Sequence, residues 1–443
     1  MAVSAVSAIA TRRSAVAALN IALQIVLLAA PGMARAQSAD FNPARLDWPA
    51  ARAAWLDRSR DLRAARRDIE SAEADTLTAR NRLVPTLSYN AVAIDTHHGL
   101  GPGGPSDKRA DSILRLDQTF ERGGKRDLRI AQAGAALDAS RADYLGATRA
   151  GSAWLAGLFY DLAAAQDRAD LARQSAALAD TALGAAITRR DAGDLAAADA
   201  ERVRTDTLRA RNDAASADAA LAQARLALAR ALAVEPLAPT LRVDAGWPEP
   251  VPDEAGLRAA ERNRLMAALD DRPELRAARF RADAARAARD LAASQRTRDI
   301  TVGVQAEHYP GPNGTGNTVG FGVSVPLFAN ANAAGPIRSA EVDVDRAQEA
   351  LDRARADAGA DIAATAADLD AAARRLARTR DELMPSAQRS LDAAEFAFSH
   401  GASGVTDVLD ARRAWRAAEA DAIATRADYA RALAAWRALL DQP

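Results

Sequence analysis

Two aspartates near the C-terminal end stand where the helical pattern of the chain breaks and resumes. In the stretch SHGASGVTDVLDARR, residues 399–413, glycines interrupt the pattern and Asp407 and Asp410 follow as it restarts. Residues at i and i+3 share one face of a helix. Two carboxylates on one face favour the capture of protons or cations. A structural role explains the same residues equally well, because Thr406 or Asp407 can cap the new helix and acidic groups favour its positive dipole end.

Histidine and cysteine give no support for a metal or thiol site. The chain has no cysteine and four histidines. These histidines lack the spacing of a zinc centre, so we expect no metal site and no cofactor. His400 lies beside the aspartates and is interpreted either as a modulator of their site or as an exposed surface residue. His97, His98 and His308 are expected in the loops at the ends of two β-hairpins.

The segment ERGGKR at 121–126 resembles a phosphate loop only superficially. The spacing G-x-x-x-x-G-K-[ST] is absent, and Arg126 stands where Ser or Thr is needed. Gly123 and Gly124 instead predict a sharp turn from a strand into a helix. No motif surrounds a Ser/His/Asp set, so we expect no enzyme. With 58 basic and 59 acidic residues, the chain also lacks the basic surface of a nucleic-acid binder.

The N-terminus has the features of an export signal. Arg12 and Arg13 precede an apolar run that ends at Pro31-Gly32, and the small-x-small pattern at residues 34–36 is typical of a cleavage site. We therefore predict a signal peptide over 1–36. The alternative is a membrane anchor, but the run is short and contains Asn20 and Gln24.

The rest of the chain is a duplication. The first repeat, 37–234, is predicted as a helix, a β-hairpin over 85–121, a long helix, a break near 193 and a further helix. A proline-rich connector follows at 235–253. The second repeat, 254–443, has the same order, with a continuous helix to about residue 298, a hairpin over 299–328, a long helix, a break near 401 and a last helix.

Each predicted strand alternates apolar and polar residues. Leu114, Leu116 and Phe120 oppose Arg115 and Asp117, and the strands at 300–309 and 319–325 follow the same rule. In the strand at 86–94 the polar side turns apolar at Val92 and Ile94. Alternation over nine to eleven residues suits a strand that crosses a bilayer at a tilt. A half-buried sheet in a soluble domain gives the same pattern. Four strands cannot close a barrel, so a membrane location requires several copies to pool their strands.

The helices carry a seven-residue apolar period. It is seen at Leu155, Leu162 and Ala169 in the first repeat, and at Ile362, Leu369, Leu376 and Leu383 in the second. Such a period predicts coiled-coil packing. The longest predicted helix, at over sixty residues, approaches about 100 Å. The predicted fold class is therefore mostly α with a small β part.

The chain resembles the TolC family of outer-membrane efflux proteins over its whole mature length. The duplicated hairpins, VSVPLF at 323–328 and above all GVTDVLDA at 404–411 carry the resemblance. The segment QTFERGGKR at 118–126 is similar to the strand-to-helix junction of the CzcC-like branch, whose members serve divalent-metal efflux by RND systems.

The resemblance implies a homotrimer in the outer membrane that reaches into the periplasm. Its long coiled-coil helices form an α-helical tunnel, and its four β-strands per chain join a trimeric 12-stranded transmembrane β-barrel in contact with outer-membrane lipids. Asp407 and Asp410 match the aspartates that form the constriction at the periplasmic tip, and Asp199 is the weaker match in the first repeat. An arginine that locks the tip in some relatives is missing between Gly401 and Asp407, so any lock must come from elsewhere.

Three functions follow as hypotheses. The first is the channel of a tripartite efflux system for divalent metal cations, with a periplasmic adaptor (membrane fusion) protein and an inner-membrane RND-type pump as partners. The second is the duct of a multidrug or type I protein export system. The third, from another class, is a trimeric coiled-coil scaffold or adhesin. A ring of tip carboxylates would make the first two sensitive to pH and divalent cations and selective for cations.

Overall fold

The computed structural model describes residues 41–94, 97, 110–250, 254–311, 314–327 and 329–441. The chain divides into a unit that ends at Asn42 and a larger unit that begins at Pro43. The predicted signal peptide, 1–36, and His98 lie outside the described residues. Everything below concerns the larger unit.

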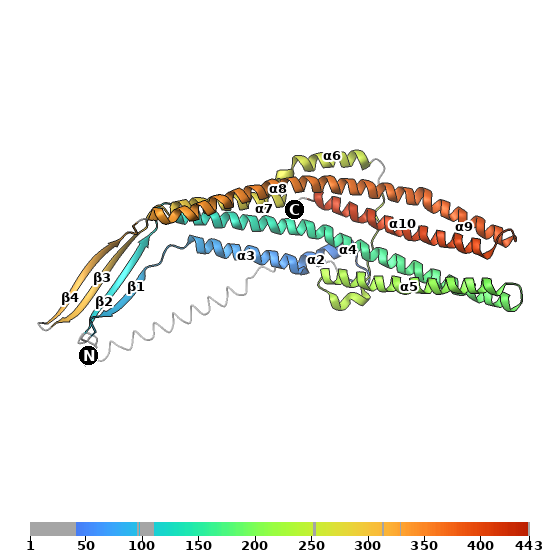
Figure 1. The fold of residues 1–443 in the computed structure, drawn as a ribbon, viewed down its shortest axis with the longest axis horizontal. Coiled ribbons are helices and arrows are strands. Elements are labelled where there is room, and N and C mark those ends of the chain that lie inside the picture. Colours follow the sequence, from blue (N-terminus) through green and yellow to red (C-terminus); the bar gives the residue numbers. More distant parts are fainter. Residues whose placement is uncertain are drawn as a thin grey trace, which may run out of the picture. The chain divides into compact units, whose positions relative to one another are not determined.

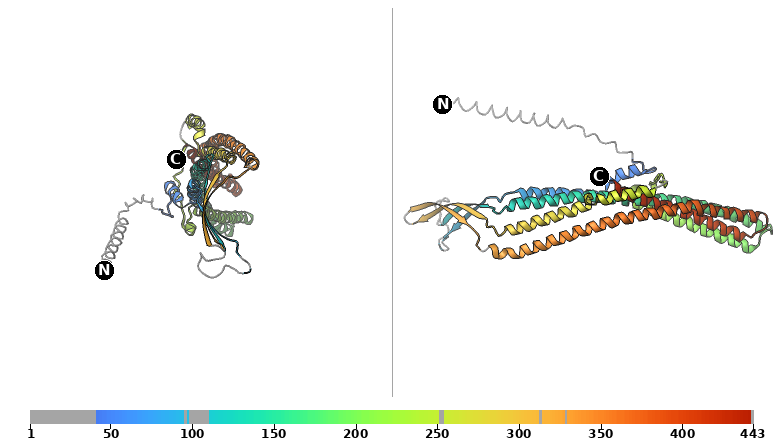
Figure 2. Two further views of the ribbon diagram at one scale, coloured as in Figure 1. Left: turned by 90° about the vertical axis from the view of Figure 1, so that its left-hand side faces the viewer. Right: turned by 90° about the horizontal axis from the view of Figure 1, so that it is seen from above.

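Figure 1 shows the strands of this unit at one end and two helical hairpins at the other, and the second view in Figure 2 agrees. None of the helices in the described ranges is both long and apolar enough to cross a membrane. The elements of the first repeat are α2 (Trp48–Arg58), α3 (Arg60–Arg80), β1 (Thr86–Val92), β2 (Asp111–Phe120), α4 (Lys125–Asp191) and α5 (Ala197–Ala231).

A connecting segment with the short 3-10 helix η2 (Glu235–Thr240) joins the repeats. The elements of the second repeat are α6 (Glu254–Ala267), the 3-10 turn η3 (Leu269–Asp271), α7 (Pro273–Ser294), β3 (Ile300–Gly311), β4 (Gly314–Ser324), α8 (Ala329–Arg378), the π-helical turn η4 (Thr379–Leu383), α9 (Met384–Ser399) and α10 (Val405–Leu440). The order of elements in the two repeats therefore corresponds, as the sequence pattern predicts.

The four strands form one antiparallel sheet in the order β1-β2-β3-β4. The register places Asp117 beside Gly303, and Gly303 beside Gly322, so one face of the sheet carries the predicted polar set. The other face is apolar and open, with Phe321 exposed over 84% of its surface. The alternation predicted for the strands is thus present, and β1 and β4 are the two edges.

The second β-hairpin is longer than the sequence suggests. Residues 310–317 are rich in glycine and proline, which predicts a loop, but β3 runs to Gly311 and β4 begins at Gly314. The prediction of a loop for His308 is therefore wrong: its Nδ1 atom lies 2.7 Å from Oδ1 of Asn317 on the neighbouring strand. A glycine at 316 permits this pairing, because a Cβ there would lie 2.3 Å from the ring of Tyr309.

The first helix of each repeat is broken in two, where the sequence pattern predicts one helix. Ser59 separates α2 from α3 and caps α3, since its hydroxyl accepts a hydrogen bond from the backbone N–H of Leu62 at 3.3 Å. Arg272 separates α6 and η3 from α7 with an extended backbone, because a residue that precedes a proline avoids the helical conformation. Both breaks lie in the helical segment that precedes the β-hairpin of a repeat, so the interruption is a feature that the two repeats share.

The heptad pattern of the second repeat holds only as far as the π turn. Ile362, Leu369 and Leu376 are buried in the core with Trp436 of α10. Leu383 continues the period in the sequence but is 41% exposed. Leu383 is the last residue of the π turn. This turn contains one residue more than an α-helical turn, so the side chains beyond it are rotated around the helix axis.

Gln166 fixes the connector to the middle of α4. Its buried side-chain amide donates to the carbonyl oxygen of Val243 at 3.0 Å and accepts from the N–H of Val243 at 2.9 Å. Beside it, the indole N–H of Trp247 donates to Asp167. Burial raises the pKa of Asp167, and this hydrogen bond opposes the shift. The buried amide pair satisfies both polar groups of Val243 in the connector backbone, as burial requires.

Candidate functional site

Two glycines turn the chain at the helical end of the unit. Gly193 has φ +82° between α4 and α5, and Gly401 has φ +73° between α9 and α10. Only glycine adopts this left-handed conformation without strain. Figures 1 and 2 show both turns at the same end of the unit, farthest from the strands. We call α4 with α5 the first tip hairpin, and α9 with α10 the second tip hairpin.

Asp407 caps the helix that it begins. It is the third residue of α10, and its Oδ2 accepts a hydrogen bond from the backbone N–H of Gly404 at 3.2 Å. Glycine has no side chain with which to cap the helix, so Asp407 supplies a side-chain bond that the N-cap residue cannot. The structural interpretation of Asp407 therefore holds. Its carboxylate also remains exposed, which leaves it free to face other groups.

Asp410 lies one turn further along and is paired with an arginine of its own helix. Nη1 of Arg413 donates to Oδ1 of Asp410 at 2.9 Å, and the Asp410 side chain is 62% exposed. The pair reduces the negative charge that Asp410 presents. The two predicted carboxylates thus differ, since one bonds to the backbone and the other to a cation.

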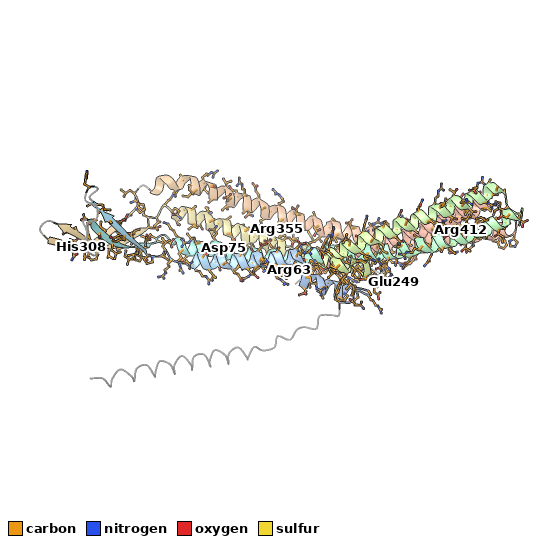
Figure 3. The ribbon with its side chains drawn as sticks, turned by 90° about the horizontal axis from the view of Figure 1, so that it is seen from below. Arg63, Asp75, Glu249, His308, Arg355 and Arg412 are labelled. Atoms are coloured by element: carbon orange, nitrogen blue, oxygen red, sulfur yellow. The ribbon has the colours of Figure 1, made fainter. Side chains whose placement is uncertain are left out.

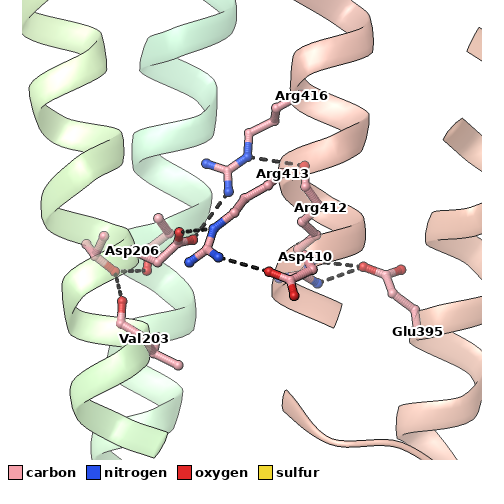
Figure 4. Close-up of polar contacts among 9 residues, drawn as sticks. Val203, Asp206, Glu395, Asp410, Arg412, Arg413 and Arg416 are labelled. Carbon is pink, nitrogen blue, oxygen red and sulfur yellow. Dashed lines mark hydrogen bonds and ion pairs between the residues drawn. The ribbon is translucent and has the colours of Figure 1, made fainter. Parts of the chain in front are cut away.

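Arg413 also reaches across to the first tip hairpin, where it meets Asp206 of α5 (Figure 4). Its Nε donates to Oδ1 of Asp206 at 2.9 Å, and Nη2 of Arg416 donates to Oδ2 at 3.3 Å. The Asp206 side chain is only 9% exposed, whereas those of Arg413 and Arg416 are 43% and 26% exposed. We call these three residues the hairpin clamp, because they join the two tip hairpins through one buried carboxylate.

The hairpin clamp does not stand out in the sequence. A usable signal is nevertheless present: Asp199, Asp206 and Asp213 follow one another at intervals of seven on α5, and Asp410, Arg413 and Arg416 at intervals of three on α10. Such spacings place each set along one side of its helix. Which sides face each other follows only from the packing of α10 against α4, which the sequence does not specify.

Each tip hairpin also has ion pairs of its own. In the second, both Nε and Nη2 of Arg412 bond Oε1 of Glu395, at 3.0 and 2.8 Å, and so join α10 to α9. In the first, Arg211 of α5 bonds Asp180 of α4 at 2.9 Å. Figure 3 shows Arg412 at the helical end, where exposed side chains surround the hairpins. These exposed pairs hold each hairpin together but do not connect the two.

Asp199, the weaker candidate, occupies the first turn of α5. Its Oδ1 accepts from Nη1 of Arg202 at 2.7 Å, so it too is paired within its own helix. The side chain is 30% exposed. Its environment therefore resembles that of Asp410 rather than that of Asp407, because its described bond is to an arginine and not to the backbone of a helix end.

His400 is bonded to the end of α9. Its Nδ1 atom lies 2.9 Å from the carbonyl oxygen of Phe396, and the centres of the two rings lie 4.1 Å apart. No group of three or more His, Asp or Glu residues with the geometry of a metal site occurs in the part of the chain that the structure describes. The described contacts of His400 are thus those of a helix end.

Gly123 and Gly124 make the turn from β2 into α4. Both have positive φ, +75° and +70°. A Cβ at Gly123 would lie 2.8 Å from the Cβ of Thr297, so both conformation and space require glycine there. The next residue after this pair, Lys125, is buried and its Nζ bonds Oδ1 of Asp299 at 2.8 Å. The junction is therefore a structural joint between the two repeats.

The chain belongs to the outer membrane efflux protein family, whose model matches residues 31–234 and 265–442. It is 24% identical over 353 residues, 80% of each chain, to the cobalt-zinc-cadmium resistance protein CzcC of Cupriavidus metallidurans. Its fold matches a membrane protein of Pseudomonas aeruginosa with a TM-score of 0.72 at 20% identity, over 88% of this chain and 93% of the other. The outer membrane protein VceC of Vibrio cholerae matches with a TM-score of 0.71 at 17% identity, over 88% and 95%.

The family and the fold together define what this protein is. It is an outer-membrane efflux channel that extends into the periplasm. The resemblance stated from the sequence is therefore confirmed, as is the fold class.

Proposed function

We propose that this chain forms a homotrimer in which three sheets of four strands close one barrel of twelve. The open edges of the sheet carry the proposal. Within the described part of the chain, strands β1 and β4 each pair on one side only, and the face that would meet lipid is apolar. Unpaired strand edges are not tolerated in hydrocarbon, so the sheet needs partners on both edges. Identical copies supply them, since β4 of one copy can pair with β1 of the next.

The helices would continue the barrel as a tunnel across the periplasm. Helix α4 has 67 residues, a length of about 100 Å. It packs against α3 and α7 nearer the strands and against α5 and α10 nearer the tips. A trimer of such bundles encloses a central bore. In this arrangement the two tip hairpins of each chain narrow the periplasmic end.

At that end Asp407 and Asp410 would form a gate that favours cations. Three chains bring together six carboxylates, two from each. Asp199 would add to this ring to a smaller extent, because Arg202 already pairs with it. His400 lies next to the turn and would modulate the ring only if the trimer brings it near these groups. The hairpin clamp would hold the gate narrow by tying the first tip hairpin to the second.

The channel would act in a tripartite system, with a periplasmic adaptor protein and an inner-membrane RND-type pump as the source of energy. We further propose divalent metal cations as its substrate. Two facts support this choice: the name of the relative CzcC is that of a cobalt-zinc-cadmium resistance protein, and the exposed carboxylates at the tip suit cations. The chain itself would be a passive duct and no enzyme.

Recording from the purified protein in planar bilayers tests this function. The wild type should migrate as a trimer in detergent, give discrete conductances and carry Zn²⁺ current. Zn²⁺ held between the tip carboxylates should also partly block the current through the wild-type channel. In Asp407→Asn with Asp410→Asn these charges are lost, so this block should weaken. An acceptor for the Gly404 N–H remains, so the fold should persist. A monomer without conductance would refute the channel. Unchanged Zn²⁺ block in the double variant would refute the gate alone.

A further inference from the structure

The polar face of the sheet, which would face inward in the proposed barrel, carries one positively charged residue and several negatively charged ones on its four strands. Arg115 is the only lysine or arginine in β1, β2, β3 and β4. Asp111, Asp117 and Glu307 are the acidic residues of the same strands. All four have the parity that the register assigns to the polar face. On this face a lone arginine is therefore an exception that calls for an explanation.

Asp117 holds this arginine against the sheet. Nε of Arg115 donates to both carboxylate oxygens of Asp117, at 2.9 and 2.8 Å. The two residues are neighbours on one face of β2, and their side chains are 36% and 25% exposed. A pair of this kind directs the guanidinium along the strand instead of away from it.

Glycines on the adjacent strands provide the space for the pair. A Cβ at Gly303 would lie 2.1 Å from Oδ1 of Asp117 and 3.2 Å from Nη2 of Arg115. A Cβ at Gly322, one strand further, would lie 3.5 Å from the same Nη2 atom. The guanidinium therefore lies over a glycine-lined strip of β3 and β4. Any side chain at Gly303 would displace the carboxylate that fixes it.

We propose that Arg115 and Asp117 set the charge preference of the barrel bore, with Asp117 as the positioning residue. This inference rests on the proposed trimeric barrel. In that barrel Asp117 neutralises Arg115 and holds it close to the wall, so the bore stays wide. The remaining strand carboxylates, Asp111 and Glu307, then favour cations. Without Asp117, Arg115 would extend into the water-filled bore and favour anions.

A cysteine probe on the inward face measures this preference without involving the tips. The chain has no cysteine, and Ser88 of β1 pairs in register with Arg115. Ser88→Cys in the wild-type background would be modified from outside by an anionic and by a cationic methanethiosulfonate reagent, and the two rates compared. Reagents that enter through the outer mouth of the barrel do not pass the helical end, so the gate does not affect the ratio.

The variants should form an ordered series. Adding Asp117→Asn should raise the anionic-to-cationic rate ratio about two- to threefold, because one positive charge per chain loses its partner. Arg115→Gln should lower the ratio. The double variant, Arg115→Gln with Asp117→Asn, should restore it nearly to the wild-type value because the net charge is again the same. Gly303→Ala keeps the net charge and only displaces the carboxylate, so it should raise the ratio less than Asp117→Asn does. Gly322→Ala, whose new methyl makes only ordinary contact, should resemble the wild type.

The possible outcomes separate the two proposals. Equal ratios in all variants, with the introduced thiol reactive to both reagents, would overturn the role of Arg115 and Asp117 and leave the barrel intact. An introduced thiol that reacts with neither reagent, although the trimer is present in the outer membrane, would mean that this face does not line water. That result would overturn the barrel and this inference together.

Discussion

The two tip hairpins occupy equivalent places in the two repeats, but the side chains through which they contact each other have opposite charges. The first tip hairpin contributes Asp206, a carboxylate buried on α5. The second contributes Arg413 and Arg416 on α10. The turns themselves remain alike, with Gly193 and Gly401 in the same left-handed conformation. The duplicated halves have thus kept the geometry of the turn and diverged in the residues that join them.

If the proposed gate opens by separation of the two tip hairpins, this difference identifies the bonds that must break. Arg412 stays within its own hairpin, while Arg413, the next residue, bridges to the other. Arg413 also bonds Asp410, so the clamp and the proposed gate share one guanidinium. If the hairpins separate, Arg413 keeps Asp410 as its remaining partner. In the proposed gate, the negative charge that Asp410 presents would therefore depend on the distance between the hairpins.

The largest effect is expected from Asp206→Ala. This change leaves two arginines facing each other without the anion that they share, and removal of one partner of a buried ion pair is costly. Because both arginines retain contact with solvent, we expect a loss of roughly 1–2 kcal/mol in the stability of the tip. Bilayer recordings should show a several-fold rise in conductance.

Asp218→Ala is the matched control for that change. It removes an aspartate from the same helix, but one whose described ion pair is with Arg173 of α4, inside the first tip hairpin. Its conductance should stay near that of the wild type. If both variants opened the channel equally, the hairpin clamp would have no special role.

A smaller rise is expected from Arg413→Ala, since Arg416 still bonds Asp206 in that variant. The neighbouring change Arg412→Ala breaks only the pair with Glu395 inside the second tip hairpin. It should leave conductance almost unchanged. Single-channel recordings on the two variants, side by side, check this prediction, and the opposite order would contradict the assignment of the bridging residue.

The smallest effect is expected on helix stability, from Asp407→Ala. The change removes the bond to the backbone N–H of Gly404 and should cost about 1 kcal/mol, a typical value for a helix cap. Asp407→Asn should cost less, because the amide oxygen can still accept that bond. Thermal unfolding followed by circular dichroism in detergent compares the two, and equal losses would show that charge rather than capping is what Asp407 supplies.

The sequence predicts most of the fold because its signals are local. Strand alternation, seven-residue periods and glycine breaks each depend on residues that are near one another in the chain. The errors arise where a few residues override a pattern. Ser59 and the pair Arg272-Pro273 divide helices whose periodicity continues across them, and Gly316 lets a glycine-rich segment extend a strand.

The candidate site is predictable only in part, because some of its contacts are not local. Asp407, Asp410 and Asp199 stand out because each follows a break in the pattern. Asp206 follows no break in the pattern. Its partners are more than two hundred positions away in the chain, and Arg413 is separated from it by 207 positions. Contacts of that range depend on how the helices pack. No spacing within a single helix reveals them.

The π-helical turn at Thr379–Leu383 has a practical consequence for protein engineering. One additional residue turns everything beyond it by about 100° around the helix axis. A chimaera that exchanges the tip of this chain with that of a relative should therefore be spliced beyond Met384, on the tip side of the turn. A junction placed before it would require the donor segment to carry the same extra residue, or the donor side chains beyond the junction would point in the wrong direction.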